Sequence, residues 1–296
     1  MNIIECVPNF SEGRNQGIIE DIASALAAVS GVRLLDHSMD PDHHRSVFTF
    51  IGPPERIVDG ALAACSRAAE LIDMRMHRGA VHPRIGAVDV VPFIPLGDAE
   101  MKDAVDAAHR FGSLFGTRNG IPVYFYGSAA LSPQRRELPD IRRGGYEGLE
   151  ERLKDPKWKP DAGPAFFNVH SGATAVGARI PLVAFNVVLS CGELKPAEDI
   201  ARSIRQSSGG LRHIKALGVP LKSRNLVQVS MNLTDYRETS MRRVFDEIKA
   251  KAERLGVEIL ESELIGLVPR AALAGRPPEY YRLKDFSEKR ILENCL

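Results

Sequence analysis

Apolar runs and polar turns alternate along the first half of the chain in a way that predicts a defined order of strands and helices. Four short apolar runs, at residues 3–7, 32–35, 46–51 and 87–93, are typical of strands. Two segments between them carry apolar side chains at helical spacing. Asn15 can cap the first helix, and Pro54 opens the second. The predicted order is strand, helix, strand, strand, helix, strand.

The second half repeats this order. Strands are predicted at 182–189, 211–217, 226–232 and 257–260, and helices at 196–204 and 241–255. A turn around Gly218-Val219-Pro220 is expected to join the two middle strands. Two βαββαβ units predict an α+β fold of two ferredoxin-like subdomains, each an antiparallel sheet with helices on one face. We place them at 1–178 and 179–296 and expect the substrate cleft between them.

The region between the two units has a different pattern. Residues 98–115 are predicted to form a helix and 123–126 a strand. Residues 132–160 are charged and contain several prolines, which favours a solvated connector on the surface. The arginine pairs Arg135-Arg136 and Arg142-Arg143 allow a second interpretation, in which they meet a carboxylate-rich substrate.

Composition excludes several classes of protein. The 296 residues include 39 basic and 38 acidic side chains, a net charge of +1, so we expect no nucleic-acid partner. We expect no membrane span, because the apolar stretch 180–191 is too short to cross a bilayer, and we find no secretion signal at the N-terminus. The four cysteines are scattered without metal-type spacing. A reduced, cytoplasmic protein is the simplest interpretation.

The segment His82–Leu96 carries the first chemical signal. His82 lies in a loop fixed by Pro83, directly before an apolar run typical of a buried strand. An imidazole at the edge of a core strand can accept and return a proton, because it titrates near neutral pH. The alternative is a histidine that only holds the loop by hydrogen bonds.

The segment Gly163–Arg179 carries the second signal. Its small residues, at Gly172 and beyond, let a backbone approach a ligand or another strand closely. Phe166 and Phe167 could sandwich a flat ring whose polar edge Asn168 and Ser171 would bind. Tight packing between the two subdomains explains the same pattern. A dinucleotide or P-loop site is not indicated, because both glycine motifs are missing.

Two further clusters carry weaker signals. Asp40-Pro41-Asp42-His43-His44-Arg45 contains metal-ligand types, but adjacent histidines on an extended loop point to different sides, so we expect a polar rim or a plain loop and no metal. The stretch 11–14 follows the first strand, a position that often hosts ligands. We find no GxSxG elbow and no cysteine with a nearby base in sequence. Direct transfer is therefore favoured over a covalent intermediate.

Three blocks taken together, at 7–14, 82–87 and 172–179, resemble the glutamate formiminotransferase family. The resemblance spans essentially the whole chain and includes 225–233 and 267–269. It implies transfer of a formimino group between the N5 nitrogen of tetrahydrofolate and the amino group of glutamate, as in histidine degradation and one-carbon metabolism. It also implies the two-subdomain fold, a homodimer, and tetrahydrofolate as a co-substrate without a metal. In animals a cyclodeaminase follows this domain. This chain ends where that enzyme would begin, so we expect no deamination.

The resemblance also assigns site residues. The family's catalytic histidine matches His82, which we expect to shuttle a proton between the two nitrogens. Asp36 or Asp40 is a candidate to orient it or to stabilise a cationic intermediate, and Asn9, Arg45 and Arg179 are further supporting candidates. The family's folate-binding stretch matches ten consecutive residues: Gly163, Pro164, Ala165, Phe166, Phe167, Asn168, Val169, His170, Ser171 and Gly172.

The chain departs from the family pattern at three places. Ala80-Val81 precedes His82 where relatives usually have a glutamate, His44-Arg45 replaces Asn-Arg, and Asn186-Val187-Val188 lacks a second asparagine. These changes leave two alternatives open. One is a glutamate formyltransferase that uses 5-formyltetrahydrofolate, and the other is a catalytically silent folate-binding protein.

Overall fold

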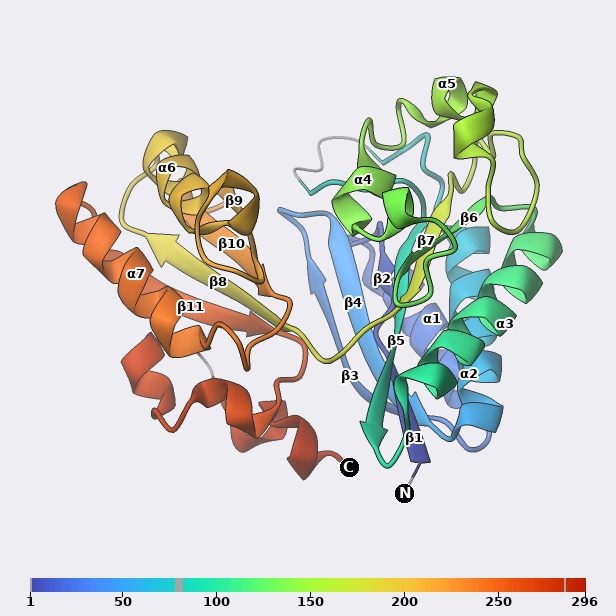
Figure 1. Ribbon diagram of the computed structural model, residues 1–296, viewed down its shortest axis with the longest axis horizontal. Helices are drawn as coiled ribbons and strands as arrows, with labels where there is room; N and C mark the ends of the chain where they lie inside the picture. The colour runs from blue at the N-terminus through green and yellow to red at the C-terminus, as the bar shows by residue number, and fades with distance from the viewer. Residues whose placement is uncertain (1, 78–81, 285) are drawn as a thin grey trace. The chain divides into compact units, whose positions relative to one another are not determined.

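The computed structural model describes residues 2–77, 82–284 and 286–296. The chain forms two compact units, residues 1–179 and 180–296, each with its own sheet and hydrophobic core (Figure 1). The predicted α+β class with two subdomains is confirmed. Within the described ranges, no helix has the length and apolar character needed to cross a membrane.

Among its described residues, the first unit contains the predicted βαββαβ order together with three further helices and three further strands. Its elements are β1 (Asn2–Cys6), β2 (Asn9–Phe10), α1 (Gln16–Ala27), β3 (Arg33–Asp40), β4 (Arg45–Gly52), α2 (Pro54–Leu71), β5 (Val88–Gly97), α3 (Met101–Asn119), β6 (Val123–Gly127), α4 (Leu138–Arg142), α5 (Leu149–Lys154) and β7 (Thr174–Ala178), with 3-10 turns η1 (Pro133–Arg135) and η2 (Pro156–Trp158).

The sheet of the first unit is antiparallel in one part and parallel in the other. Strands β3, β4, β1 and β5 lie side by side in the antiparallel ferredoxin-like order, and the short β2 continues β1 between β4 and β5. Strand β7 then pairs parallel to β5, and β6 pairs parallel to β7. The prediction of a purely antiparallel sheet is therefore wrong for this unit, because α3 acts as the crossover that parallel strands require.

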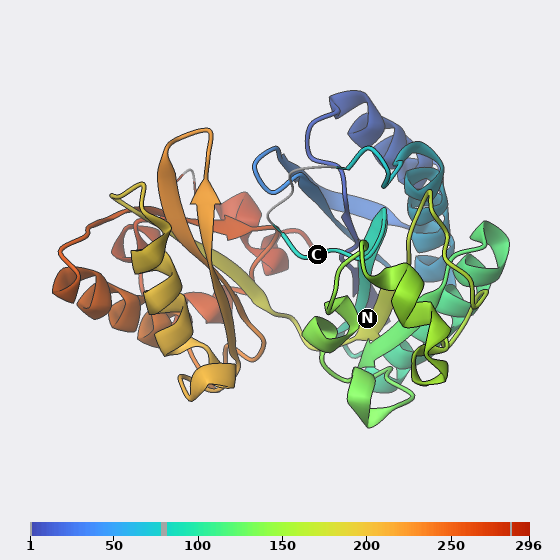
Figure 2. The same cartoon turned by 90° about the horizontal axis from the view of Figure 1, so that it is seen from above.

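The two faces of this sheet have different characters. Helices α1, α2 and α3 cover one face of the sheet (Figures 1 and 2). Apolar side chains that include Ile4, Phe50 and Phe93 form the core of the unit. Because side chains alternate along a strand, the intervening residues point to the opposite face. Buried polar residues such as Thr49 and Asp89 lie there. The second face of the sheet is therefore the one that can hold a site made of polar and charged side chains.

Residues 132–160 are not the solvated connector that their composition suggests. Ile141 and Leu149 are buried in a small core with Tyr124 on the second face of the sheet. The guanidinium of Arg152 stacks 4.1 Å from the ring centroid of Trp158. The segment therefore covers part of the sheet, and it does so with few apolar residues, which is why the sequence pattern hid it.

The second unit is an antiparallel sheet in the order β11–β8–β10–β9, with α6 and α7 packed on it. This is again the ferredoxin-like order. Its elements are β8 (Val183–Leu189), α6 (Leu194–Ile204), β9 (Ile214–Leu221), β10 (Leu226–Leu233), α7 (Met241–Arg254) and β11 (Ile259–Ile265), with 3-10 turns η3 (Gln206–Ser208), η4 (Arg270–Leu273), η5 (Pro278–Tyr281), η6 (Glu288–Arg290) and η7 (Leu292–Asn294).

Two local predictions are corrected by the strand boundaries. The turn expected at Gly218-Val219-Pro220 is wrong, because β9 continues through these residues and the chain reverses at 222–225. Pro220 is tolerated because β9 is the edge strand, where a missing N–H donor costs little. The strand predicted at 32–35 is longer than expected, because β3 extends to Asp40.

Candidate active site

His82 is half-buried in the loop before β5. Its Nδ1 lies 2.9 Å from the carbonyl oxygen of Pro83 and 3.3 Å from Nη1 of Arg45. The shorter contact favours an Nδ1–H that donates to the carbonyl, which leaves the lone pair on Nε2. Within the described ranges, Nε2 makes no hydrogen bond. The ring is therefore oriented through one nitrogen and can react through the other.

A network of buried charges lies behind this ring. Nη1 of Arg45 donates to Oδ2 of Asp89 at 2.6 Å, and Nε and Nη2 of Arg45 donate to Oδ1 of Asn9 at 3.0 and 2.8 Å. Arg142 on α4 donates to both oxygens of the same carboxylate, and the backbone N–H of Ile85 donates to Oδ1 at 3.0 Å. Asp89 is fully buried and joins β4, β5 and α4.

This network sets the charge state of the site. Burial acts to raise the pKa of Asp89, but Arg142 and Arg45 outweigh it and lower that pKa to about 2. Burial lowers the pKa of Arg45 to about 10, so its guanidinium stays charged at neutral pH. Burial and then the charges of Arg45 and Arg142 hold the pKa of His82 well below its usual value. His82 is thus neutral at pH 7. The near-neutral pKa expected from the sequence is not supported by this environment.

The two adjacent histidines of the β3–β4 turn point to different partners. Nδ1 of His43 lies 2.7 Å from Oδ2 of Asp40, and the His43 ring stands edge-on to His82 with centroids 6.3 Å apart. His44, at φ +49°, accepts a hydrogen bond from the backbone N–H of Gly13 at 3.2 Å and stacks on His77 at 4.2 Å. Only His43 of this pair faces the candidate site.

The supporting candidates divide into two groups. Asn9 and Arg45 belong to the network behind His82. Asp40 bonds to His43 and not to His82, and Asp36 lies on β3 at the register position of Thr49. Arg179, at the end of β7, acts instead on Glu5, whose pKa burial raises to about 7 against the charge of Arg179. The described polar contacts of His82 are thus made by Pro83 and Arg45, and His43 contributes a ring contact.

The stretch 163–172 is joined to the His82 segment by backbone hydrogen bonds. The N–H of Ala87 donates to the carbonyl of Ser171 at 2.9 Å, and the N–H of Ala173 donates to that of Ile85 at 3.0 Å. A Cβ on Gly86 would meet the carbonyl oxygens of Ala173 and Ser171 at 2.3 and 2.4 Å. Glycine is therefore required for this contact.

Most polar side chains of the stretch hold the loop itself. Nδ2 of Asn168 donates to the carbonyl of Gly120 at 2.9 Å, its Oδ1 accepts from the N–H of Ser171 at 2.8 Å, and Oγ of Ser171 donates to the carbonyl of Ala69 at 3.1 Å. Phe167 packs against Tyr146 with centroids 5.4 Å apart, whereas Phe166 is 61% exposed. The two phenylalanines therefore have different surroundings.

The structure adds residues that sequence reasoning did not assign to the site. Asp89 is the one charged residue in the apolar run 85–96, a signal that could have identified it. From the sequence, Arg142 is expected in a surface connector or against a carboxylate-rich substrate, and His43 in a polar rim or plain loop; neither is expected beside His82. The departure at Ala80-Val81 lies outside the described residues.

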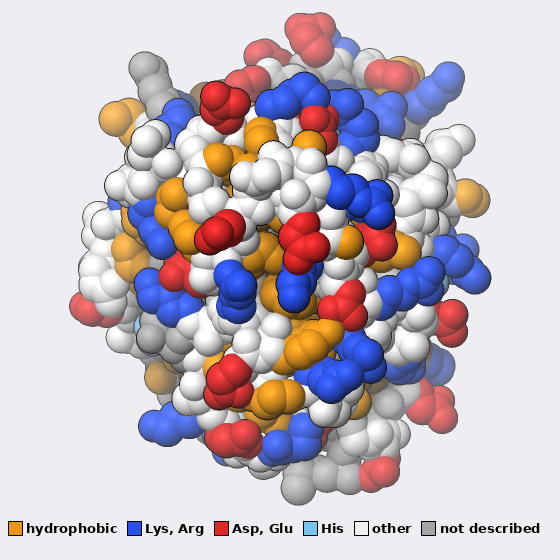
Figure 3. Space-filling view, turned by 90° about the vertical axis from the view of Figure 1, so that its left-hand side faces the viewer, with side chains coloured by type: hydrophobic (Ala, Val, Ile, Leu, Met, Phe, Trp, Pro, Cys, Tyr) orange, Lys and Arg blue, Asp and Glu red, His pale blue; other side chains and the backbone are white. Residues whose placement is uncertain are grey.

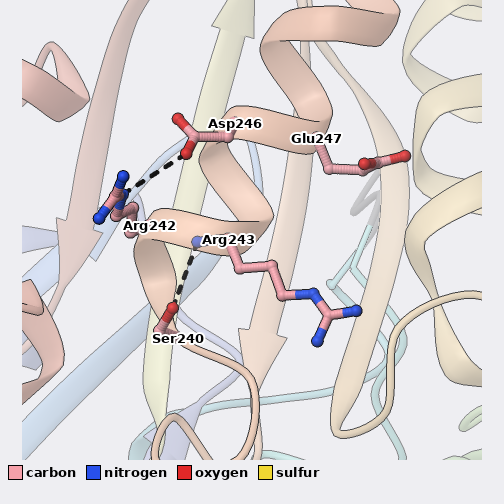
Figure 4. Close-up of a pocket in the computed structure, with 5 residues that line it drawn as sticks. All are labelled: Ser240, Arg242, Arg243, Asp246 and Glu247. Carbon is pink, nitrogen blue, oxygen red and sulfur yellow. Dashed lines mark hydrogen bonds and ion pairs between the residues drawn. The ribbon is translucent and has the colours of Figure 1, made fainter.

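A surface depression of about 390 Å³ lies on the second unit at the start of α7 (Figure 4). The five residues that line it are Ser240, Arg242, Arg243, Asp246 and Glu247. Oγ of Ser240 caps the helix by accepting from the N–H of Arg243, and Arg242 pairs with Asp246. The face seen in Figure 3 intersperses basic and acidic side chains in the same way. The depression is explained by helix capping and ion pairing on the surface.

Comparisons with known proteins show the family to which the chain belongs. The family model for the formiminotransferase domain, N-terminal subdomain, matches residues 3–179, and that for the formiminotransferase domain matches 184–293. A glutamate formimidoyltransferase of Thermoplasma acidophilum is 46% identical over 99% of this chain and 97% of its own length. One from Streptococcus pyogenes serotype M1 is 42% identical over 99% and 98%. A formimidoyltransferase-cyclodeaminase of Rattus norvegicus is 44% identical over 92% of this chain and 51% of its own length.

Proposed function

We propose, from the premise that this chain belongs to the formiminotransferase family, that it transfers a formimino group between N5 of tetrahydrofolate and the amino group of L-glutamate. Tetrahydrofolate is then a co-substrate. The observation that carries the proposal is the full-length similarity to two glutamate formimidoyltransferases at 42–46% identity.

His82 is the proposed proton-transfer residue. The attacking nitrogen adds to the –CH=N– carbon and must lose a proton as its bond to carbon forms. A neutral imidazole can take that proton, and the charges of Arg45 and Arg142 support the neutral form of His82. The Pro83 carbonyl fixes the ring so that Nε2 presents the lone pair. Holding the two substrates in contact supplies the rest of the acceleration.

Direct transfer without a covalent intermediate fits the cysteines of the first unit. Cys6 and Cys65 are both buried. Burial raises the thiol pKa of each well above its usual value, so neither supplies a thiolate at neutral pH.

The stretch 163–172 is the proposed folate-binding segment. Its backbone bonds to residues 85–87 support a place close to His82. The Asn168 and Ser171 side chains already bond to the backbone of Gly120 and Ala69. The contribution of the stretch to binding is therefore proposed to come from its backbone and from exposed apolar side chains such as Phe166.

A product assay tests the proposed function. The protein is incubated with glutamate and either 5-formiminotetrahydrofolate or 5-formyltetrahydrofolate, and the amino-acid products are separated by mass. We expect N-formiminoglutamate from the first donor and a much slower reaction with the second. A panel of other amino acids defines the acceptor. Formyl transfer alone, or saturable tetrahydrofolate binding without any product, would overturn the proposal.

We further propose a cytoplasmic location and a homodimer. The four cysteines lie far apart in the sequence without metal-type spacing, which supports a reducing compartment. Light scattering of the purified protein tests the dimer through its mass, because a monomer is 32.5 kDa.

A further inference from the structure

A second imidazole stands beside His82 and is held by a carboxylate. His43 is buried, its Nδ1 lies 2.7 Å from Oδ2 of Asp40, and its backbone N–H donates to Oδ1 of Asp40 at 2.8 Å. Its ring is nearly perpendicular to that of His82, at 86°, with centroids 6.3 Å apart. At this spacing the two rings can serve two nitrogens bonded to one carbon, since each needs a hydrogen bond of about 3 Å.

The two rings face charges of opposite sign. His82 faces Arg45 and Arg142, with Asp89 beyond them, and these cations favour a neutral ring. His43 faces Asp40 at the end of β3 and His82 across the gap. Burial acts to raise the pKa of Asp40, but the hydrogen bonds from His43 lower it, so the carboxylate is ionised. This carboxylate holds the His43 ring through Nδ1, so the ring is fixed beside His82.

We propose that His43 is a second catalytic residue, a general acid that Asp40 positions, and this rests on the proposed function. The nitrogen that bonds to the formimino carbon gives its proton to His82. The nitrogen whose bond to that carbon breaks receives a proton from the His43 imidazolium and leaves as the neutral amine. One proton is taken up and one is delivered, so the step is balanced, and exchange with water restores both rings.

The neighbouring histidines are occupied in other ways and provide a matched control. Nδ1 of His44 accepts the Gly13 N–H, and His77 bonds through Nε2 to the carbonyl of His44 and through Nδ1 to Nε of Arg84. These contacts hold the turn against the loop at Gly13. His44→Asn therefore changes an adjacent buried histidine without touching the proposed acid.

The test compares His43→Gln, Asp40→Asn and His44→Asn with the wild-type protein. For His43→Gln we expect kcat to fall about 100-fold, with the tetrahydrofolate Kd within about threefold of wild type. Loss of the acid also removes the decline of kcat at alkaline pH. Asp40→Asn keeps that decline but moves it to lower pH, and His44→Asn leaves kcat within about twofold and the profile in place.

The outcomes separate the two proposals. A His43→Gln variant with kcat within about threefold of wild type, or with an unchanged alkaline decline, overturns the role of His43 alone. A variant that loses folate binding and thermal stability together shows a structural role and overturns it as well. A wild-type protein that forms no formimino product overturns the proposed function, and the inference with it.

Discussion

At the scale of the residue, the site is organised by one carboxylate that two guanidinium groups share. Asp89 is fully buried between Arg45 and Arg142, and its Oδ1 also accepts a hydrogen bond from the backbone N–H of Ile85. A buried charge is tolerated only when its partners compensate it. Removal of this carboxylate would leave two buried cations without a counter-charge directly behind the His82 ring.

We therefore expect Asp89→Asn to lower the free energy of unfolding by about 3–5 kcal/mol, measured by urea denaturation. A matched control is Asp59→Asn, which breaks the surface pair with Arg56 and should cost less than about 1 kcal/mol. Equal losses in the two variants would contradict the importance given to the buried network.

His44 gives stability a defined pH dependence. Burial and then His77 lower the pKa of His44 from 6.5 to about 4 in the folded protein. Between these values the unfolded chain binds more protons than the folded one, so stability falls as the pH falls from about 6.5 to about 4 and levels off below. Burial lowers the pKa of His82 in the same direction.

His44→Asn should therefore flatten the acid side of the stability curve. Asparagine tolerates the positive φ of this position and does not titrate. We expect its thermal midpoint to drop less than that of the wild type between pH 7 and pH 4.5, measured by calorimetry. Parallel curves for the two proteins would show that His44 does not carry this dependence.

At the scale of the element, three segments far apart in sequence meet around Gly86. Oγ of Ser11, after β2, donates to the Gly86 carbonyl at 2.7 Å, and residues 171–173, before β7, bond to residues 85 and 87. This contact joins the proposed folate stretch to the loop of His82. A side chain at Gly86 would push the segments apart.

Gly86→Ala should lower the free energy of unfolding by more than about 2 kcal/mol and weaken tetrahydrofolate binding, because backbone atoms cannot yield as a flexible side chain can. Gly17→Ala, in the first turn of α1, is the control. There the nearest atom to a new Cβ is Oδ1 of Asn15 at 3.3 Å, and alanine favours helix by about 1 kcal/mol. If Gly86→Ala folds and binds folate as the wild type does, the close backbone contact at Gly86 does not have the importance given to it here.

Periodicity predicted most elements because each buries one face in a core. The periodicity predicted helices α1 and α2, which bury Ile22 and Ile57, and the strands of both ferredoxin-like units. The direction of strand pairing does not follow from periodicity, because the parallel pairing of β7 and β6 depends on contacts distant in sequence. The extension of β9 through Pro220 was hidden because an edge strand tolerates residues that otherwise signal turns.

At the scale of the whole molecule, the two faces of the first unit's sheet have different roles. One face packs on α1, α2 and α3, and the other carries Asp89 and its partners under the segment that includes α4 (Figure 1). The motif leads to the proposal of His82, whereas the positions of Arg142 and His43 near it could not be predicted from the sequence. Their roles depend on a long connector folding back and on the direction in which a turn points each side chain.

The kinetics of His82→Ala test the central claim most directly. Formation of N-formiminoglutamate from 5-formiminotetrahydrofolate and glutamate is followed together with tetrahydrofolate binding. The account predicts that kcat falls by about 10²–10⁴-fold while the folate Kd stays within about threefold. A variant that turns over at the wild-type rate would contradict it.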